Sequence, residues 1–101
     1  MPGSENSTAL VFHCVYIIQS IKNKNLYVGY TDNLRRRIKE HNQGLNFSTK
    51  SNRPWQIIHY EAYLNKKDAQ RRENYLKSSQ GSRLLKRMLK EYFYEQKSKN
   101  N

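Results

Sequence analysis

Three short stretches rich in apolar, β-branched and aromatic residues predict β-strands. The segment 12–20, FHCVYIIQS, has the composition of a strand that is covered on both faces. Turn-forming residues at 21–25 separate it from the segment 26–31, LYVGYT, so the two segments are expected to form an antiparallel hairpin. A third strand is expected at 55–63, WQIIHYEAY.

The first predicted helix follows the second strand directly. Apolar and polar residues recur at helical spacing from Leu34 to about His41. Asp32 or Asn33 can cap its N-terminus, and Asn42-Gln43-Gly44 provides the stop signal. The segment 45–54, LNFSTKSNRP, is a long polar loop, and such loops are often functional or mobile.

Two more helices are predicted after the third strand. One covers 65–79 with Asn65 as its cap, and the other covers 83–96 after the turn residues 80–82. The resulting order, β-β-α-β-α-α, defines an α+β (mixed α/β) domain with helices packed against a sheet. A single domain over 10–94 is expected, between a disordered segment 1–9 and a disordered tail 95–101.

The charge balance points to a polyanionic partner. Lys and Arg number 19 against 8 Asp and Glu, which gives a net charge of +11 in 101 residues. Nucleic acid is favoured over an anionic membrane, and a basic surface that serves only solubility is the alternative. Cys14 stands alone, no apolar run approaches the ~20 residues of a membrane span, and no signal-peptide pattern is present. A reducing, cytoplasmic setting is therefore expected.

Arg37 and His41 lie one turn apart along the edge of the apolar stripe formed by Leu34 and Ile38. Two aligned polar groups at the border of a core could form the wall of a site. Alternatively, the Arg37 stem covers the core while His41 caps the end of the helix. The spacing alone favours neither interpretation.

Glu73 falls on the buried face of the second predicted helix, between Ala69 and Leu76. A carboxylate in that position is costly unless it is paired or binds a cation. A hard divalent ion such as Mg²⁺ can be held by one carboxylate together with water and a substrate phosphate. The commoner solution, which spacing alone favours, is a local ion pair with one of three basic neighbours: Lys66, Arg72 or Lys77.

Basic residues on the helices form a candidate nucleic-acid-binding set. On the last predicted helix they gather opposite the apolar side, which suits phosphate contacts but is also typical of a solvated helix face. The full set comprises Arg35, Arg36, Lys39, Arg72, Lys77, Arg83, Lys86, Arg87 and Lys90.

Tyrosines mark the first two strands. Tyr16 lies in the first and Tyr27 in the second, where packing with an exposed hydroxyl is the usual role. Gly29 is unusual in the same strand as Tyr27, because a glycine there often marks the close approach of another group.

Taken together, VYII, YVGYT, NLRRRIKEH and RRENYLK resemble the GIY-YIG nuclease domain, in the right order and at the right distances. The match is closest to small stand-alone bacterial proteins related to the N-terminal domain of one component of the excision-repair nuclease (excinuclease), and it covers roughly Cys14 to Met88. The resemblance implies a three-stranded antiparallel sheet flanked by helices. It also implies metal-dependent hydrolysis of a DNA phosphodiester, with Mg²⁺ or Mn²⁺ as the cofactor.

The resemblance assigns a role to each matching residue. Tyr16 and Tyr27 stand for the tyrosines of the two tripeptides, one of which helps to activate or orient the attacking water. Arg37 matches an arginine that contacts the scissile phosphate, and His41 matches a histidine close to a tyrosine hydroxyl. Glu73 matches the single carboxylate that binds the metal ion. Within this scheme the glycine two residues after Tyr27 would let the substrate backbone come close.

Three positions depart from the family pattern. Val15 replaces the glycine that opens the first tripeptide, Tyr30 stands where some members have lysine, and Leu85 stands where many have asparagine. The leading hypothesis is an endonuclease acting on branched, nicked or damaged DNA in repair or recombination. The competing hypotheses are a non-catalytic nucleic-acid-binding module, favoured by Leu85 and the basic last helix, and a subunit that needs a protein partner for DNA targeting.

Overall fold

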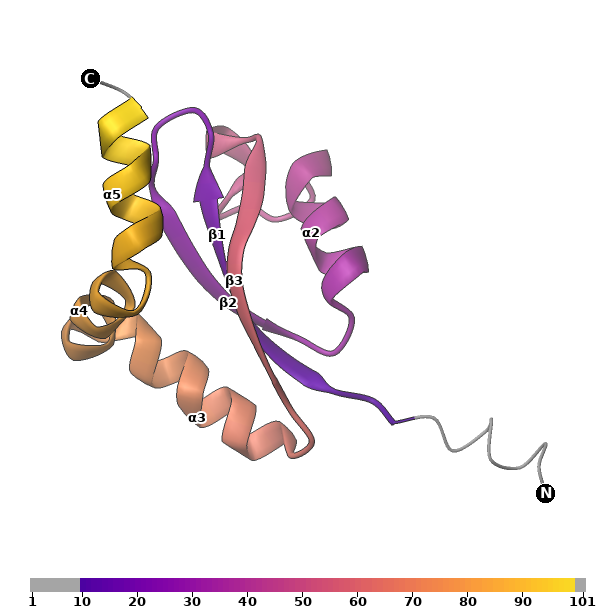
Figure 1. Ribbon diagram of the computed structural model, residues 1–101. Helices are drawn as coiled ribbons and strands as arrows, with labels where there is room; N and C mark the ends of the chain where they lie inside the picture. The colour runs from indigo at the N-terminus through magenta and orange to yellow at the C-terminus, as the bar shows by residue number, and fades with distance from the viewer. Residues whose placement is uncertain (1–9, 100–101) are drawn as a thin grey trace.

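The computed structural model describes residues 10–99 and contains one antiparallel sheet with helices on both of its faces (Figure 1). The strand order in the sheet is β2-β1-β3, so the predicted α+β class and the predicted hairpin are both confirmed. In chain order the elements are β1 His13–Ser20, β2 Leu26–Thr31, α2 Leu34–Gln43, the 3₁₀ turn η1 Lys50–Asn52, β3 Trp55–Tyr63, α3 Lys66–Lys77, α4 Ser79–Met88 and α5 Lys90–Lys99.

The central strand β1 divides the core into two parts because its side chains alternate between the two faces. Val15 and Ile17 pack against α3 and α4 on one face. Tyr16 and Ile18 pack on the other face with Trp55, beneath α2. Figure 1 shows this arrangement, with α2 on one side of the sheet and α3, α4 and α5 on the other. Strand β1 is therefore covered on both faces, as predicted.

The ends of α2 and α3 are fixed by the predicted capping residues. Asn33 caps α2 by accepting a hydrogen bond from the backbone N–H of Arg36, and Gly44 closes the helix with a φ of 80°. Asn65 caps α3 in the same way, accepting from the N–H groups of its second and third residues. These caps hold the two helices that carry the candidate site residues.

The last predicted helix is wrong in two respects, because it is two helices and the first of them starts earlier. Residues 80–82, expected to form a turn, belong to α4, whose cap Ser78 accepts a hydrogen bond from the N–H of Gly81 at 3.1 Å. Gly81 is needed for close packing: a Cβ there would lie 2.0 Å from the carbonyl oxygen of Tyr75. The chain then bends at Leu89, which has φ −110° and ψ 27°.

Helix α5 runs beside the β1–β2 hairpin and continues to Lys99, past the predicted end at Gln96 (Figure 1). Gln96 and Tyr92 hold it there by hydrogen bonds to the side chain of Gln19 on β1. The predicted segment 1–9 and residues 100–101 of the predicted tail lie outside the described residues. In the part of the chain that is described, no helix has the length and apolar character needed to cross a membrane.

Candidate active site

A buried chain of hydrogen bonds joins β1, α2 and the loop before β3. The Tyr16 hydroxyl lies 2.7 Å from His41 Nε2, and His41 Nδ1 lies 2.7 Å from the Thr49 hydroxyl. The Trp55 indole N–H donates to the Thr49 carbonyl at 2.8 Å and so fixes the loop. All four side chains are buried. Sequence reasoning missed Thr49, because a lone threonine in a loop has no periodic signal.

Burial keeps both members of the Tyr16–His41 pair neutral. It lowers the pKa of His41 to about 4, assisted by the positive charge of Arg37 and opposed by Glu40. It also raises the pKa of Tyr16 to about 12, and the nearby Arg37 guanidinium only partly offsets this effect. At neutral pH a protonated phenol therefore contacts a neutral imidazole, which has one N–H and one free lone pair.

Tyr27 joins this pair from the edge strand β2. Its ring centroid lies 5.2 Å from that of His41 and 6.4 Å from that of Trp55, with the rings inclined at 63° and 61°. Edge-to-face packing of this kind fixes the imidazole in place. The structure therefore brings Tyr16, Tyr27 and His41 together, as the resemblance implies.

Arg37 lies one helical turn before His41 on α2. It donates a hydrogen bond to Glu40 at 3.0 Å, and its side chain is 31% exposed. Its charge acts on both Tyr16 and His41. The helix-cap interpretation of His41 is wrong, because the imidazole bonds inward and Gly44 closes the helix.

Glu73 lies on α3, so it approaches from the opposite layer of the fold. Its side chain is 18% exposed and pairs with Lys77 at 2.9 Å, which is the local ion pair that spacing favoured. The negative charge of Glu73 is one of the smaller influences that raise the pKa of Tyr16. The phenol thus feels charge from Arg37 on α2 and from Glu73 on α3.

The residues present fit a metal ion held by one carboxylate. Among residues 10–99 no group of three or more His, Cys, Asp and Glu side chains could enclose an ion. A single, mostly buried carboxylate suits Mg²⁺, which keeps several waters and takes further oxygens from a substrate phosphate. Any such cation would compete with the Lys77 ammonium for Glu73.

Gly29 makes room for the tyrosine rather than for another backbone. Gly29 pairs with Tyr16 across the β1–β2 ladder. A Cβ at this position would lie 2.3 Å from both Cζ and the hydroxyl oxygen of Tyr16. The close approach expected at Gly29 is therefore made by the tyrosine ring, which crosses the glycine toward the β2 edge of the sheet.

Two of the departures from the family pattern are core residues. Val15 is fully buried and Leu85 is 2% exposed, and both belong to the cluster between the sheet and the α3–α4 pair. The third, Tyr30, forms a hydrogen bond with His13 at 2.7 Å and stacks on its ring. Leu85 therefore offers no polar group to the site.

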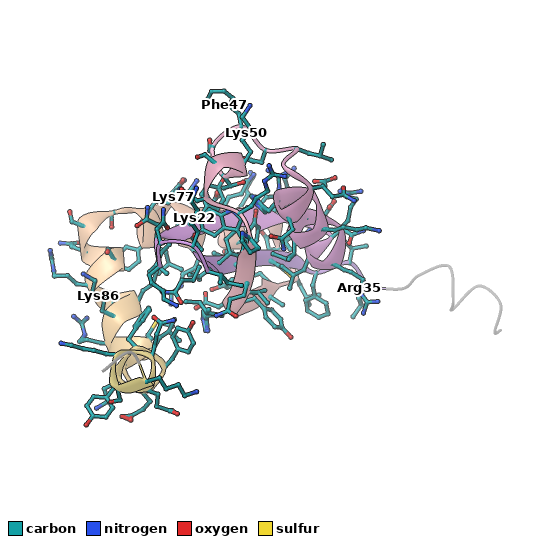
Figure 2. The ribbon with its side chains drawn as sticks, turned by 90° about the horizontal axis from the view of Figure 1, so that it is seen from above. Lys22, Arg35, Phe47, Lys50, Lys77 and Lys86 are labelled. Atoms are coloured by element: carbon teal, nitrogen blue, oxygen red, sulfur yellow. The ribbon has the colours of Figure 1, made fainter. Side chains whose placement is uncertain are left out.

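The predicted nucleic-acid-binding residues do not gather into one surface. Figure 2 shows Arg35 of α2 and Lys86 of α4 at opposite ends of the molecule. Arg36 pairs with both Asp32 and Glu40, at 3.8 and 3.7 Å. Arg35, Arg36 and Lys39 thus belong to the α2 side of the sheet, whereas Arg83, Lys86, Arg87 and Lys90 belong to the other side.

Arg72 is committed to an ion pair that sequence reasoning missed. Its guanidinium makes two hydrogen bonds to Glu61, at 2.9 and 3.1 Å, and Tyr63 and His59 also contact that carboxylate. Burial raises the pKa of Glu61, but these partners outweigh it and lower the pKa to about 2. The signal in the sequence was the spacing of 59, 61 and 63, which places three polar groups along one strand.

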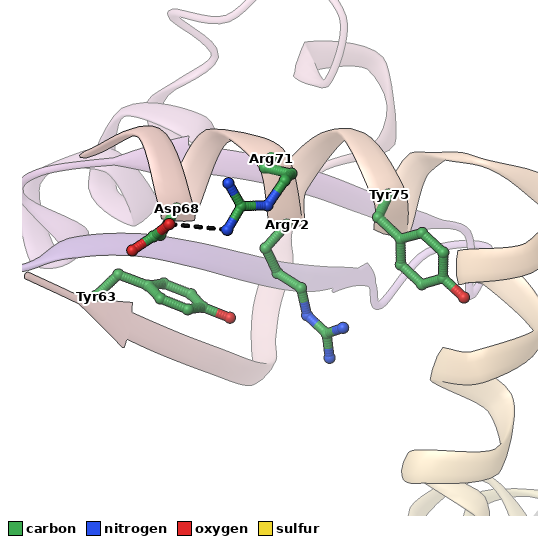
Figure 3. A pocket seen from close by; sticks show the side chains of 5 residues that line it. All are labelled: Tyr63, Asp68, Arg71, Arg72 and Tyr75. Carbon is green, nitrogen blue, oxygen red and sulfur yellow. Dashed lines mark hydrogen bonds and ion pairs between the residues drawn. The ribbon is translucent and has the colours of Figure 1, made fainter. Parts of the chain in front are cut away.

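A groove of about 600 Å³ lies beside this ion pair, on the outer side of α3 (Figure 3). Arg71 and Arg72 line it with Tyr63 and Tyr75, and Arg71 pairs with Asp68 at 2.8 Å. Both arginines are therefore neutralised by carboxylates, and the groove has little net charge.

The sheet, its two tyrosines and the flanking arginine and glutamate helices define a small α+β domain of nuclease type. The family described as the GIY-YIG catalytic domain matches residues 12–91. The chain belongs to the GIY-YIG family, whose domain is a nuclease fold.

Several curated relatives of the chain are UPF0213 proteins. One from Clostridium perfringens is 42% identical over 64 residues, which are 62% of this chain and 68% of the relative. One from Staphylococcus haemolyticus is 39% identical over 75 residues, covering 73% and 90% of the two chains. The protein YazA of Bacillus subtilis is 35% identical over 86 residues, covering 84% and 80%.

Proposed function

We propose that this protein is a metal-dependent endonuclease that hydrolyses DNA phosphodiester bonds, with branched, nicked or damaged DNA as its substrate in repair or recombination. The observation that supports the proposal is the buried Tyr16–His41–Thr49 chain. The phenol at its end is influenced by a cationic Arg37 and an anionic Glu73. A proton-carrying group, a phosphate-binding cation and a metal-binding carboxylate are the parts that phosphodiester hydrolysis requires.

Arg37 binds the scissile phosphate in this proposal. Its guanidinium remains charged at all relevant pH values and can offer two parallel donors to non-bridging oxygens. Negative charge grows on those oxygens in the transition state, so the contact strengthens as the reaction proceeds. A divalent cation bound at Glu73 would supply further positive charge to the same phosphate.

Tyr16 orients the attacking water. Because its pKa is about 12, the phenol keeps its proton at neutral pH and acts through its hydroxyl oxygen, which can accept a hydrogen bond from the water. When the water gives up a proton to this oxygen, the phenol proton can pass to His41 Nε2 at 2.7 Å. The pKa of His41, about 4, makes it a weak final acceptor, so positioning is the larger part of its role.

A non-catalytic nucleic-acid-binding module is the second candidate function. It is favoured by the core position of Leu85 and by the Lys77–Glu73 ion pair, which satisfies the carboxylate without a metal. The two candidates differ in metal dependence, because GIY-YIG nucleases are generally dependent on a divalent metal.

The test is a cleavage assay on labelled single-stranded, duplex, nicked and branched DNA in Mg²⁺, Mn²⁺ or EDTA. Arg37→Ala and Glu73→Gln should each reduce the rate about 100-fold, the usual effect of losing one transition-state contact. Arg71→Ala and Glu91→Gln are matched controls on exposed helix faces and should cleave like the wild type.

DNA binding measured in parallel separates the two functions. Cleavage that needs the metal and is lost in both site variants supports the endonuclease. Absence of cleavage by the wild type, with salt-sensitive binding that neither EDTA nor Glu73→Gln changes, would establish the binding module instead.

A further inference from the structure

A second groove, with a volume of about 690 Å³, lies between α5, the end of α4 and the β1–β2 hairpin. Figure 1 shows α5 beside the hairpin, on the face of the sheet opposite α2. The groove is therefore separate from the Tyr16–His41 pair, which packs under α2. It is also separate from the groove on the outer side of α3, with which it shares no lining residue.

The charge of this groove is positive and is not compensated by its own lining. Lys24, Lys86, Lys90 and Lys97 contribute to its walls, and none of its lining residues is acidic. Among the ion pairs of the described residues none involves these four lysines. This differs from the groove beside Arg72, where each arginine has its own carboxylate. Four uncompensated lysines around one cavity favour a ligand with several negative charges.

The groove also has apolar and aromatic surface. Leu26, Phe93 and Tyr94 line it, and Tyr94 is 71% exposed although it is a large aromatic residue. Lysines that follow a backbone, together with exposed aromatic rings, are the combination by which proteins bind single-stranded nucleic acid. A duplex buries the faces of its bases and would leave the aromatic rings without a stacking partner.

We propose that this groove binds a single-stranded segment of nucleic acid, with unstacked bases on Phe93 and Tyr94 and phosphates along the lysines. An acidic peptide would satisfy the charges, but it has no planar groups for the two rings. The inference rests on the proposed function for its substrate class, because branched and damaged DNA contains unpaired segments.

The strand β2 connects this groove with the candidate active site. Leu26 lines the groove, whereas the next residue, Tyr27, points to the opposite face and packs against His41. Because β2 is an edge strand of the sheet, a nucleic-acid strand can pass round that edge without crossing another strand. The groove would thus hold the unpaired arm of a substrate whose phosphodiester lies at Arg37.

The test measures binding without cleavage, by fluorescence anisotropy of the full chain in EDTA. The probes are a thymidine oligonucleotide of about ten nucleotides, an abasic oligonucleotide of the same length and a poly-glutamate peptide. Tyr94→Ala should weaken thymidine binding about tenfold and leave abasic binding unchanged. Tyr60→Ala, which removes an exposed tyrosine from β3, is the matched control and should have no effect.

A lysine substitution tests the phosphate contacts. Lys90→Gln should reduce the slope of log K against log salt by about 0.7 for the thymidine oligonucleotide, as expected for one lost phosphate contact. Lys67→Gln removes an exposed lysine from the first turn of α3 and should leave the slope nearly unchanged.

Equal binding of thymidine and abasic probes, with no effect of Tyr94→Ala, would overturn the proposal and leave a basic surface without base stacking. Poly-glutamate binding as tight as thymidine binding would overturn it in favour of a peptide ligand. Wild-type binding that depends on Tyr94 without any cleavage in Mg²⁺ keeps the groove and rejects the nuclease. Cleavage with binding indifferent to Tyr94 does the reverse.

Discussion

At the residue scale, His41 is the group whose protonation would disturb the site most. It is fully buried, and its pKa is lowered from 6.5 to about 4 because burial disfavours the charged imidazole. The unfolded chain therefore binds a proton that the folded chain refuses between about pH 6.5 and pH 4. The stability that the neutral imidazole provides is present above pH 6.5 and is lost as the pH falls toward 4.

We expect the free energy of unfolding to fall by about 2 kcal/mol between pH 7 and pH 5 through His41 alone. Urea unfolding at both pH values measures this change. His41→Gln lowers stability at pH 7 but should remove most of the pH dependence in this window. His59→Gln, which changes a histidine on β3, is the control and should retain it. Parallel curves for wild type and His41→Gln would contradict the burial argument.

Gly29→Ala should destabilise the protein because the new methyl group would overlap the ring of Tyr16. The Cβ would lie 2.3 Å from the phenol, so the ring must leave its position over β2 and its hydrogen bond to His41. A cost of about 1–3 kcal/mol is typical of such overpacking. In a Tyr16→Ala background the same substitution should cost much less, since the overlapping ring is absent. Equal costs in the two backgrounds, measured by urea unfolding, would show that the ring is not the obstacle.

At the element scale, the Glu61–Arg72 ion pair clamps α3 to β3. Both side chains are largely buried, at 17% and 28% exposure, so removing Arg72 leaves a carboxylate without its main partner. Arg72→Gln should lower the free energy of unfolding by about 2 kcal/mol, whereas DNA affinity should change little. Arg71→Gln, on the same helix, removes an exposed ion pair and should change stability by less than about 0.5 kcal/mol.

The pH dependence of the same pair provides a second measurement. The pKa of Glu61 is lowered from 4.5 to about 2, so its contribution to stability is complete above pH 4.5 and disappears as the pH falls through 2. In Arg72→Gln this acid-dependent loss should be smaller. A variant with wild-type stability and clearly weaker DNA binding would instead make Arg72 a nucleic-acid contact.

The elements with strong local signals were predictable from the sequence. The three strands have β-branched and aromatic composition, and Asn33, Gly44 and Asn65 are the caps that helix ends require. The start of α4 was not predictable, because Gly81 is a turn residue by composition. In the fold, Gly81 lets α4 approach the Tyr75 carbonyl, and that contact exists only after α3 and α4 have packed.

The site was predictable in its members but not in their connections. Spacing and the resemblance brought forward Tyr16, His41 and Glu73, but the choice between an ion pair and a metal at Glu73 had to await the position of Lys77. The bond between Tyr16 and His41 depends on strand register and helix docking, which the local sequence does not contain. The contribution of Thr49 and the filling of the space at Gly29 have the same origin.

At the scale of the whole molecule, the positive charge is divided between two surfaces that the sheet keeps apart. A duplex bound at the candidate site rests on the α2 side, where Arg37 is located, and does not reach the exposed basic side chains of α4. Arg35→Ala/Arg36→Ala and Arg83→Ala/Arg87→Ala both remove two charges from a net charge of +11, so long-range attraction weakens equally in the two variants. Only the loss of direct phosphate contacts distinguishes them.

We therefore expect duplex affinity of the α2 double variant to lose about 1.8 from its slope against log salt, as for two phosphate contacts, and that of the α4 double variant to keep the wild-type slope. Filter binding of a short duplex in EDTA, over a range of salt concentrations, measures both slopes. Equal reductions in the two variants would mean that the duplex contacts both surfaces or neither preferentially. A reduction confined to the α4 variant would place the duplex on the α4 side and remove the electrostatic support for an active site beside Arg37.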